Sequence, residues 1–553
     1  MPRLFYSLLR LRLIVPARLI VPARLIVPAR PIYTNAKQKR QLFRPLIILP
    51  LFAGALAVHD TYFNAQVLRR TLRTAYTGVA IAVDYKLNFS PENPDQIHER
   101  VAERLADLIR RNGGLYIKLG QALTHLQAAV LPKPYARLFS SLYDEAPQVP
   151  WSIVQTLIIQ EFGKRPSELF SHISKRANAS ASIAQVHKAV LRDTGQVVAL
   201  KVQKPDIRKQ MEWDLWSYKC LMYIYDKYLF DLPLYFTVDY ISKHIRAETN
   251  FVQEARNSME SAGYIYNDKH LQDKIYVPRI YWDLTTERIM TAEWIDGCKA
   301  NDERQIRKMG LSVGQVMTNM IELFSRQIFD YGFLHCDPNP GNMLIRPSPN
   351  DRSRVQIVLL DHGLYTRLDP DFQSSYAKFW KAAVSSDTAA LSSITESWGV
   401  RSTGLLASAV LLRPYIPESD LSTFERQVEL KQKIKEFLYD QERLPKELIF
   451  ITRTWRMLQN NNQVLGSPVN RISLIAHSAS RSIVTKADGW RDWARLEWRH
   501  LKFLGVLVLF DVQFYWTRAK QFIGKKDGFE DVLERQIKGI AKQVLGIDLE
   551  DDV

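Results

Sequence analysis

The sequence predicts an α+β fold of two lobes, with a helical extension before them and a helical region after them. Two apolar, strand-like segments lie close together near residue 190, and a polar loop followed by an apolar hairpin lies near residue 340. From about residue 301 onward, apolar residues recur mostly at helical spacing. A chain of 553 residues with 46% hydrophobic and 24% charged residues is long enough for such a folded, multi-part protein.

The amino-terminal leader is basic and repetitive. The hexamer Leu-Ile-Val-Pro-Ala-Arg occurs three times within residues 13–30, and residues 1–44 contain eight Arg and two Lys but no Asp or Glu. An Arg-rich, acid-free amino terminus is typical of a mitochondrial transit peptide. We therefore expect residues 1–44 to be a mitochondrial targeting leader, although regularly spaced prolines interrupt an amphipathic helix.

The net charge of +17 does not indicate nucleic-acid binding, because ten of the basic residues lie in the leader and the rest of the chain is only mildly basic. We expect no nucleic-acid partner.

The chain has three cysteines, Cys220, Cys298 and Cys336, without a C-x-x-C pair. This argues against a disulfide framework and against a cysteine-based zinc site.

Residues 45–60 form a possible transmembrane segment. Residues 45–58 are uncharged and follow a basic stretch, but fourteen residues are fewer than the ~20 that span a bilayer. A buried hydrophobic hairpin is the alternative. If the segment spans the mitochondrial inner membrane, the positive-inside rule leaves the leader in the matrix and places the large carboxy-terminal part in the intermembrane space.

The strongest chemical signal is a polar loop in which Asp337 follows His335 by two residues and precedes Asn342 by five. Protein kinases use the same H-x-D-x-x-x-x-N spacing. Such a loop presents a carboxylate that orients a hydroxyl or a water, and an amide oxygen that holds a metal ion. We therefore predict that the two-lobed fold is protein-kinase-like.

Two apolar stretches, 343–346 and 355–360, follow this loop and predict a β-hairpin. The hairpin ends in Asp361-His-Gly, where kinases carry Asp-Phe-Gly. A carboxylate at Asp361 can bridge Mg²⁺ to phosphate oxygens.

Upstream, segments 183–190 and 197–202 predict two paired strands with Lys201 on the second. A lone strand lysine is more often a solubilising residue at a sheet edge. In a kinase, a lysine at this place contacts the ATP phosphates and pairs with a helical glutamate. Glu254 is the candidate partner.

Small residues and hydroxyls precede the first strand, where kinases have a glycine-rich loop. We expect this loop to bind the nucleotide phosphates through four residues, Ala179, Ser180, Ala181 and Ser182. Without glycine, positive φ values are restricted, so the nucleotide geometry should differ from that of a standard kinase.

The segment 288–297 has the composition of the strand that joins kinase lobes, and the backbone near Glu293 and Trp294 is expected to bind adenine.

This combination of motifs resembles the UbiB (aarF-domain) family of atypical kinase-like proteins. Ala-Ser-Ile-Ala-Gln-Val-His at 181–187 is similar to the alanine-rich loop of that family, and residues 112–121 match its K-x-G-Q helix. The resemblance implies that Lys118 and Gln121 point into the active site and restrict ordinary protein phosphorylation. From the residues alone, Lys118 would belong to the solvated face of an amphipathic helix.

Two departures from the family pattern stand out. The E-x-D motif of the family reads Glu248-Thr-Asn250 here, so the second acid is an amide, while Glu248 retains the charge to meet Lys118. His362 replaces the usual phenylalanine, as in the branch of the family that carries D-H-G.

These motifs divide the chain. We expect a leader, a possible membrane segment, a helical extension with the K-x-G-Q motif, an N-lobe, a C-lobe core and a helical carboxy-terminal region, at 1–44, 45–60, 61–165, 166–300, 301–400 and 401–553. Within the last region, the apolar segment 503–516 is interrupted by Asp511. It predicts a buried core helix, with membrane-surface contact as the alternative.

The expected function is that of an ATP-binding, ATP-hydrolysing protein that uses Mg²⁺. Lys201 would position the phosphates and Glu254 would hold it, Asn342 and Asp361 would bind Mg²⁺, and Asp337 would orient the nucleophile. The resemblance alone implies a role in mitochondrial membrane lipid or coenzyme Q homeostasis, with membrane lipids or a quinone and the mitochondrial membrane as partners. Two alternatives stay open: a Ser/Thr protein or small-molecule kinase, and a nucleotide-gated, non-catalytic lipid-binding scaffold.

Overall fold

The computed structural model describes residues 51, 54–89, 94–120, 134–135, 148–229, 235–399, 445–524 and 527–535. The chain divides into two compact units. The larger, here called the kinase-like unit, consists mainly of residues 147–203 and 243–553, and the helical unit consists of residues 2–146 and 204–242. The leader and Gln121 lie outside the described residues.

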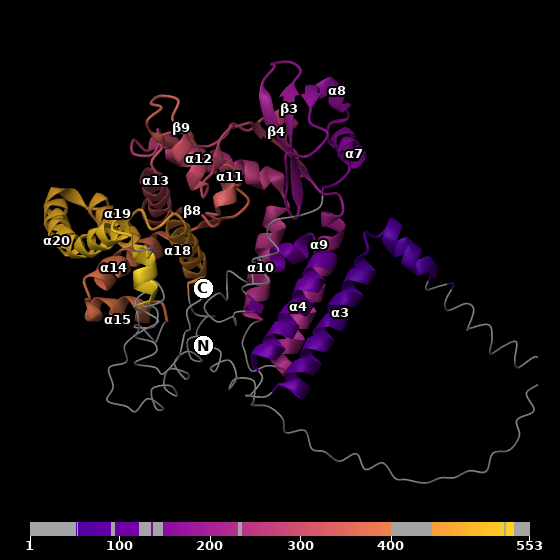
Figure 1. Cartoon of the computed structure of the whole chain (residues 1–553), viewed down its shortest axis with the longest axis horizontal. Helices are drawn as coiled ribbons and strands as arrows, with labels where there is room; N and C mark the ends of the chain where they lie inside the picture. Colours follow the sequence, from indigo (N-terminus) through magenta and orange to yellow (C-terminus); the bar gives the residue numbers. More distant parts are fainter. Residues whose placement is uncertain are drawn as a thin grey trace, which may run out of the picture. The chain divides into compact units, whose positions relative to one another are not determined.

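The helical unit is built from long helices that lie side by side (Figure 1). They are α3 (Val67–Val83), which continues into η1 (Asp84–Asn88), α4 (Pro94–Asn112), α9 (Ile207–Ile224), which continues into η2 (Tyr225–Leu229), and the first half of α10 (Phe236–Glu248). A buried ion pair between Arg70 of α3 and Asp214 of α9 holds two of them together. Lys118 lies on the short helix 115–120 of this unit and is partly buried.

No helix among the described residues is both long enough and apolar enough to cross a membrane. Of the predicted segment 45–60, residues 54–60 are described and belong to a helix that ends at residue 62. Residues 45–50, 52 and 53 lie outside the described part.

The N-lobe of the kinase-like unit is an antiparallel sheet of order β1-β3-β4-β6, with β2 beside β3. Its strands are β1 (Phe170–Ile173), β2 (Ala179–Ser180), β3 (Ala184–Leu191), β4 (Val197–Gln203) and β6 (Ile289–Glu293). The predicted pairing of the two apolar segments is confirmed as β3 and β4. Because strand side chains alternate, Val198, Leu200 and Val202 enter the core beside α7 (Trp151–Phe162), and Lys201 points to the other face.

The remaining helix of this lobe is α11 (Phe251–Asn267), which packs against β6. Shorter elements complete it: α8 (Pro166–Leu169) before β1, and η3 (Trp282–Leu284) before β6.

The C-lobe contains the predicted hairpin. Its strands are β9 (Met343–Pro347) and β10 (Val355–Leu359), within a sheet of order β5-β10-β9-β7 that includes β5 (Ile275–Tyr276) and β7 (Cys298–Lys299). The catalytic-loop candidate lies between β8 (Phe333–His335) and the turn η5 (Pro340–Asn342), and β8 pairs with β11 (Tyr365–Arg367). The predicted α+β, two-lobed fold is thereby confirmed.

The remaining described elements of the C-lobe and of the carboxy-terminal region are helices. They are α12 (Glu303–Lys308), α13 (Val313–Arg326) with η4 (Gln327–Tyr331), α14 (Pro370–Val384), α15 (Thr388–Ser397), α18 (Lys446–Val464), α19 (Arg471–Thr485) and α20 (Gly489–Phe522). Helix α19 packs on α13, α14 and α20, so the carboxy-terminal region and the C-lobe share one core. Helices α14 and α15 are separated by a short turn, in which Ser386 has a φ of 56°.

The prediction of a buried helix at 503–516 is wrong in one respect. The segment is helical and belongs to α20, but that helix buries only one face. Val508, Leu509 and Val512 are exposed, at 56%, 72% and 61% of their surface. The spacing of apolar residues shows that a helix has apolar faces. It does not show how many of these faces pack against another element.

Candidate active site

Lys201 and Glu254 meet in the N-lobe. The Lys201 ammonium lies 2.5 Å from the Glu254 carboxylate, whose side chain is only 1% exposed on α11. Helix α11 begins directly after Asn250, and the Asn250 side chain accepts hydrogen bonds from the amides of Val252 and Gln253. The amide that replaces the second acid of the family motif is therefore the N-cap of the helix that carries Glu254.

Asp361 lies on the other side of the same ammonium. Its Oδ1 atom is 3.6 Å from Lys201 Nζ and accepts a hydrogen bond of 3.0 Å from the Gly363 amide. The Asp361 side chain is 38% exposed, so the carboxylate faces solvent. Glu248 lies beside this turn, since a Cβ atom at Gly363 would be 3.6 Å from Glu248 Cγ. Lys118, its expected partner, belongs to the helical unit.

His335 links the catalytic loop to the Asp361 turn. Its Nε2 atom donates to the Asp361 carbonyl oxygen at 2.6 Å, and its Nδ1 atom accepts from the Asp337 amide at 3.1 Å. Both ring nitrogens are thus used within the protein. The histidine of the H-x-D motif therefore positions the two acidic residues and does not face a reactant.

Asn342 and Asp361 come from the same end of the hairpin. Met343 pairs with Leu359, and the Leu360 amide donates to the Asn342 carbonyl oxygen at 2.9 Å. Asn342 and Asp361 follow just outside these paired residues and are therefore close together at the same end of the hairpin. Mg²⁺ in phosphate sites is usually held by one or two protein oxygens together with substrate phosphates, and this amide–carboxylate pair fits that requirement. Among the described residues, no group of three or more His, Cys, Asp or Glu forms a denser metal site.

Both oxygens of Asp337 have a partner. Asn342 Nδ2 donates to Oδ2 at 2.8 Å, and Arg453 of α18 donates to Oδ1 at 3.3 Å. A second residue of α18, Asn461, donates to the Pro338 carbonyl oxygen at 3.0 Å. Sequence reasoning missed Arg453 and Asn461, because no motif spacing connects them to a loop more than a hundred residues earlier. Helix α18 therefore orients the catalytic-loop candidate.

His362 occupies the place of the kinase phenylalanine as a neutral ring. It is 2% exposed and stacks on Tyr365 with ring centroids 5.8 Å apart. Burial lowers the pKa of His362 to about 3, so it carries no charge at neutral pH. Its Nδ1 meets the Tyr365 hydroxyl at 2.9 Å, and its Nε2 meets the Leu359 carbonyl oxygen at 3.4 Å. The imidazole packs as an aromatic ring and adds hydrogen bonds that phenylalanine lacks.

The strand that joins the lobes limits which backbone amides are left for adenine. The Glu293 amide donates to the Arg279 carbonyl oxygen at 2.8 Å, and the Trp294 amide donates to the Val197 carbonyl oxygen at 3.2 Å. Neither amide is available to a purine. The next amide along the chain is that of Ile295. Among the described residues, it donates to no backbone carbonyl oxygen. Lys188 covers the Trp294 ring at 4.7 Å, so the indole is already occupied on one side.

The expected phosphate loop is partly strand. Ala179 pairs with Val186 and Ser180 with Gln185, which leaves a short turn closed by the Ala181 amide and the Ala184 carbonyl oxygen at 2.8 Å. The Ser182 hydroxyl in this turn is buried and has no hydrogen-bond partner among the described residues. A buried, unsatisfied hydroxyl costs about 1–3 kcal/mol, which a phosphate oxygen can recover. The turn therefore fits a phosphate ligand.

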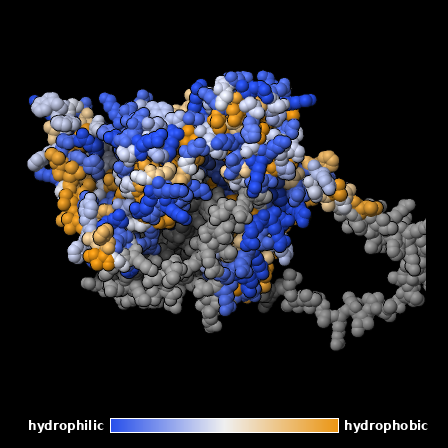
Figure 2. Space-filling model, turned by 45° about the horizontal axis from the view of Figure 1, so that its top comes forward, coloured by the Kyte–Doolittle hydropathy of each residue, from blue (hydrophilic) through white to orange (hydrophobic). Residues whose placement is uncertain are grey.

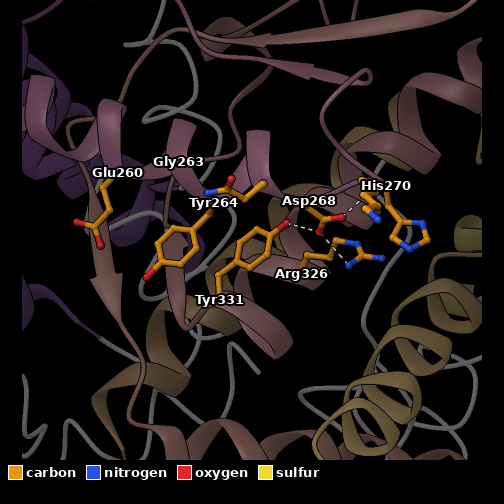
Figure 3. A pocket seen from close by; sticks show the side chains of 9 residues that line it. Glu260, Gly263, Tyr264, Asp268, His270, Arg326 and Tyr331 are labelled. Atoms are coloured by element: carbon orange, nitrogen blue, oxygen red, sulfur yellow. Dashed lines mark hydrogen bonds and ion pairs between the residues drawn. The ribbon is translucent and has the colours of Figure 1, made fainter.

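A separate hollow of about 750 Å³ lies along α11, lined by Glu260, Gly263, Tyr264 and Asn267 of that helix, and by Asp268, Arg326 and Tyr331 among others (Figure 3). Two of its acids are already paired, because Asp268 accepts from Arg326 at 2.9 Å and from the Tyr331 hydroxyl at 2.5 Å, and Glu260 pairs with Arg367. It contains none of the residues that meet around Lys201. We therefore assign the chemistry to the Lys201 site.

The pKa of Glu254 is raised in the folded protein. Burial raises it, the Lys201 ammonium lowers it, the Asp361 carboxylate raises it, and the balance is a pKa of about 7 against an ordinary value of 4.5. Between these two pH values the folded state holds more protons than the unfolded state. The stability that this carboxyl contributes is therefore fully present below about pH 4.5 and is lost as the pH rises to about 7.

Glu254→Gln removes this titration. We expect the free energy of unfolding of the wild type, relative to that of Glu254→Gln, to fall by on the order of 2–3 kcal/mol as the pH rises from about 4.5 to 7, and then to level off. Urea unfolding of both proteins across this range measures the difference. Parallel pH profiles would show that Glu254 titrates normally in the folded state.

Comparisons with known proteins agree with this geometry. Residues 141–395 match a family model described as the ABC1 atypical kinase-like domain. The chain is 41% identical over 452 residues to the ABC1 family protein C10F6.14c of Schizosaccharomyces pombe, which covers 79% of this chain and 84% of that protein. It is 35% identical over 556 residues to the ABC1 family protein lscO of Purpureocillium lilacinum, covering 91% and 92%. It is 37% identical over 292 residues to AarF domain-containing protein kinase 1 of Gallus gallus, covering 53% and 55%.

Proposed function

The chain belongs to the UbiB family, also called the ABC1 or aarF-domain family of atypical kinase-like proteins, and from that premise we propose that it binds ATP with Mg²⁺ and hydrolyses the terminal phosphate. One observation carries the proposal. The Lys201 ammonium lies between two carboxylates, 2.5 Å from Glu254 and 3.6 Å from Asp361. This arrangement places a cation beside an exposed acid, as phosphate binding with a metal ion requires.

Each residue of the site has a distinct task in this proposal. Glu254 holds Lys201 so that its ammonium reaches phosphate oxygens, and Asn342 and Asp361 hold Mg²⁺. Bound there, Mg²⁺ neutralises charge on the phosphates. Asp337 orients the attacking water, and Asn342 and Arg453 fix the direction of its carboxylate. The amide of Ile295 is the donor that remains for the adenine ring.

The setting of this activity is also a proposal. The acid-free, Arg-rich leader supports a mitochondrial location, and the uncharged stretch after it supports attachment to the inner membrane, with the kinase-like unit facing the intermembrane space. The family resemblance supports a role in membrane lipid or coenzyme Q homeostasis, in which lipids or a quinone are the partners of the protein.

The test separates binding from turnover. We expect Mg-ATP to raise the unfolding temperature of the full-length protein by a few degrees, since a ligand at ~100 times its Kd adds about 2.7 kcal/mol. We expect Asp337→Asn to keep this shift but to release phosphate at least ~100-fold more slowly than the wild type. Wild-type protein that binds Mg-ATP but releases no phosphate would contradict hydrolysis and would favour a nucleotide-gated scaffold.

Several relatives are named as protein kinases, so transfer of phosphate to a peptide is measured alongside. Phosphate that appears on an added peptide faster than in solution would replace the hydrolase proposal with a protein kinase.

A further inference from the structure

Helix α20 carries two separate apolar faces. The first is buried and packs on α19, through residues that include Phe503, Leu507 and Phe514. The second, here called the outer face, is exposed and recurs at spacings of three and four residues. Its members, with their exposed fractions, are Trp498 60%, Leu501 51%, Val508 56%, Leu509 72%, Val512 61%, Tyr515 68% and Trp516 64%.

The outer face is larger than the scattered apolar residues of an ordinary surface. Single exposed apolar side chains need no explanation, but a continuous stripe marks an interaction surface. Trp490 and Trp493 extend the stripe toward the beginning of the helix, and Phe522 and Ile523 extend it past the other end. An orange patch is visible at the left edge of the molecule in Figure 2, on the side where Figure 1 draws α20.

Cations border this face and lie over its rings. Arg491 is 5.5 Å from the centre of the Trp490 ring, Lys502 is 5.2 Å from that of Trp498, and Lys520 is 5.1 Å from that of Trp516. Long basic side chains beside exposed indoles are typical of surfaces that meet lipid headgroups, because the stem covers apolar area while the charge stays in the polar layer.

Helix α20 carries a net positive charge on its exposed surface. Residues 489–522 contain six Lys or Arg and three Asp or Glu. All three acids have partners: Asp492 pairs with Arg495, Glu497 with Arg481 of α19, and Asp511 accepts from Asn470. Among the described residues, no carboxylate pairs with Arg491, Lys502 or Lys520. These cations are available to an external anion.

We propose that α20 docks on an anionic lipid surface and lies parallel to it, with the outer face in the headgroup layer. Because the opposite face is packed on α19, the helix stays part of the fold and lies on the membrane instead of crossing it. Aromatic rings supply the affinity for the interface, and the bordering cations supply the preference for anionic lipids. This inference does not depend on nucleotide binding.

Lipid fits the outer face better than a second copy of this chain does, because the copy offers the same face, whose acids are already paired, and so has no carboxylate for Lys502 and Lys520. A segment of the chain outside the described residues is the other occupant to test, since the stretch 548–552 has the acidic charge to meet these cations. Both alternatives are distinguished by the experiment.

The experiment places a fluorescent label on the outer face of the full-length protein. Cys220 and Cys298 are replaced by Ser, Leu509→Cys carries an environment-sensitive NBD group, and Cys336 stays because it is buried. On phosphatidylcholine vesicles that contain phosphatidylglycerol, we expect the NBD emission to shift to shorter wavelength and to be quenched by lipids spin-labelled near the headgroup. The same label at Val464, which is 60% exposed at the end of α18, should stay in water.

Charge reversal provides the matched comparison. Lys502→Glu with Lys520→Glu should raise the lipid concentration for a half-maximal Leu509 response at least ~10-fold, since each surface cation contributes about fivefold. Lys299→Glu with Lys308→Glu, two exposed lysines of other elements, should change it less than about twofold.

Three results would overturn the proposal. The label at Leu509 could stay in water while the protein is bound to vesicles. A shift without vesicles that grows with protein concentration would show self-association. A shift without vesicles that is independent of concentration would show that the chain covers its own outer face.

Discussion

Asp361→Asn is expected to abolish the stabilisation of the full-length protein by Mg-ATP. The substitution keeps the shape of the side chain but removes the charge that faces Lys201 and the carboxylate that would hold Mg²⁺. At an ATP concentration that is ~100 times the wild-type Kd, the loss amounts to about 2.7 kcal/mol and a few degrees of unfolding temperature. Thermal unfolding with ATP, with Mg²⁺, and with both measures it.

The matched control lies on the same hairpin. Asp351→Asn makes the same chemical change at a residue whose side chain contacts Ser353 and Arg354 in the hairpin turn. We expect its Mg-ATP shift to equal that of the wild type. If Asp361→Asn kept the full shift, Asp361 would not belong to a nucleotide site, and the assignment of the metal to the end of the hairpin would be wrong.

Glu530→Ala should destabilise the kinase-like unit by about 3–5 kcal/mol, because it leaves a buried guanidinium without its charge partner. Glu530 and Arg471 of α19 are 1% and 0% exposed, and their closest nitrogen–oxygen distance is 3.1 Å. Glu530 also accepts a hydrogen bond from Asn462 of α18 at 3.1 Å. Urea unfolding measures the loss.

The effect should reach the active site, since α18 also carries Arg453 and Asn461, which contact the catalytic loop. Glu497→Ala is the control, because it breaks a partly exposed ion pair in the same helical region, with 48% of the Arg481 side chain and 23% of the Glu497 side chain exposed. Exposed pairs contribute at most about 1 kcal/mol, so this variant should remain close to the wild type. Equal losses in the two variants would show that the Glu530 pair contributes no more than a surface contact.

Much of the site could be predicted because its residues belong to short motifs. Each motif has a local pattern of apolar and polar residues: the strand with Lys201, the loop with Asp337 and Asn342, and the turn with Asp361. Such local patterns can be recognised in a single sequence. Glu254 is different. A glutamate in a helix is common, and only the tertiary structure brings this one, on α11, to Lys201 of β4.

Other features had no local signal. Arg453 and Asn461 reach the catalytic loop from a helix that folds back after more than a hundred residues. The backbone near Glu293 and Trp294 was expected to bind adenine, and strand and loop contacts already use the amides of both residues. Asn250 was noted as a departure from the family motif, whereas its role as a helix cap depends on where α11 begins.

The sequence by itself determined the two-lobed kinase-like fold, the family and the residues proposed to carry the chemistry, because strand alternation, helical spacing and motif spacing are properties of neighbouring residues. Only the tertiary structure decided which carboxylates flank Lys201, which distant helix orients Asp337, and which face of α20 stays exposed. Burial and pairing across long separations follow from packing, and packing depends on the whole chain at once.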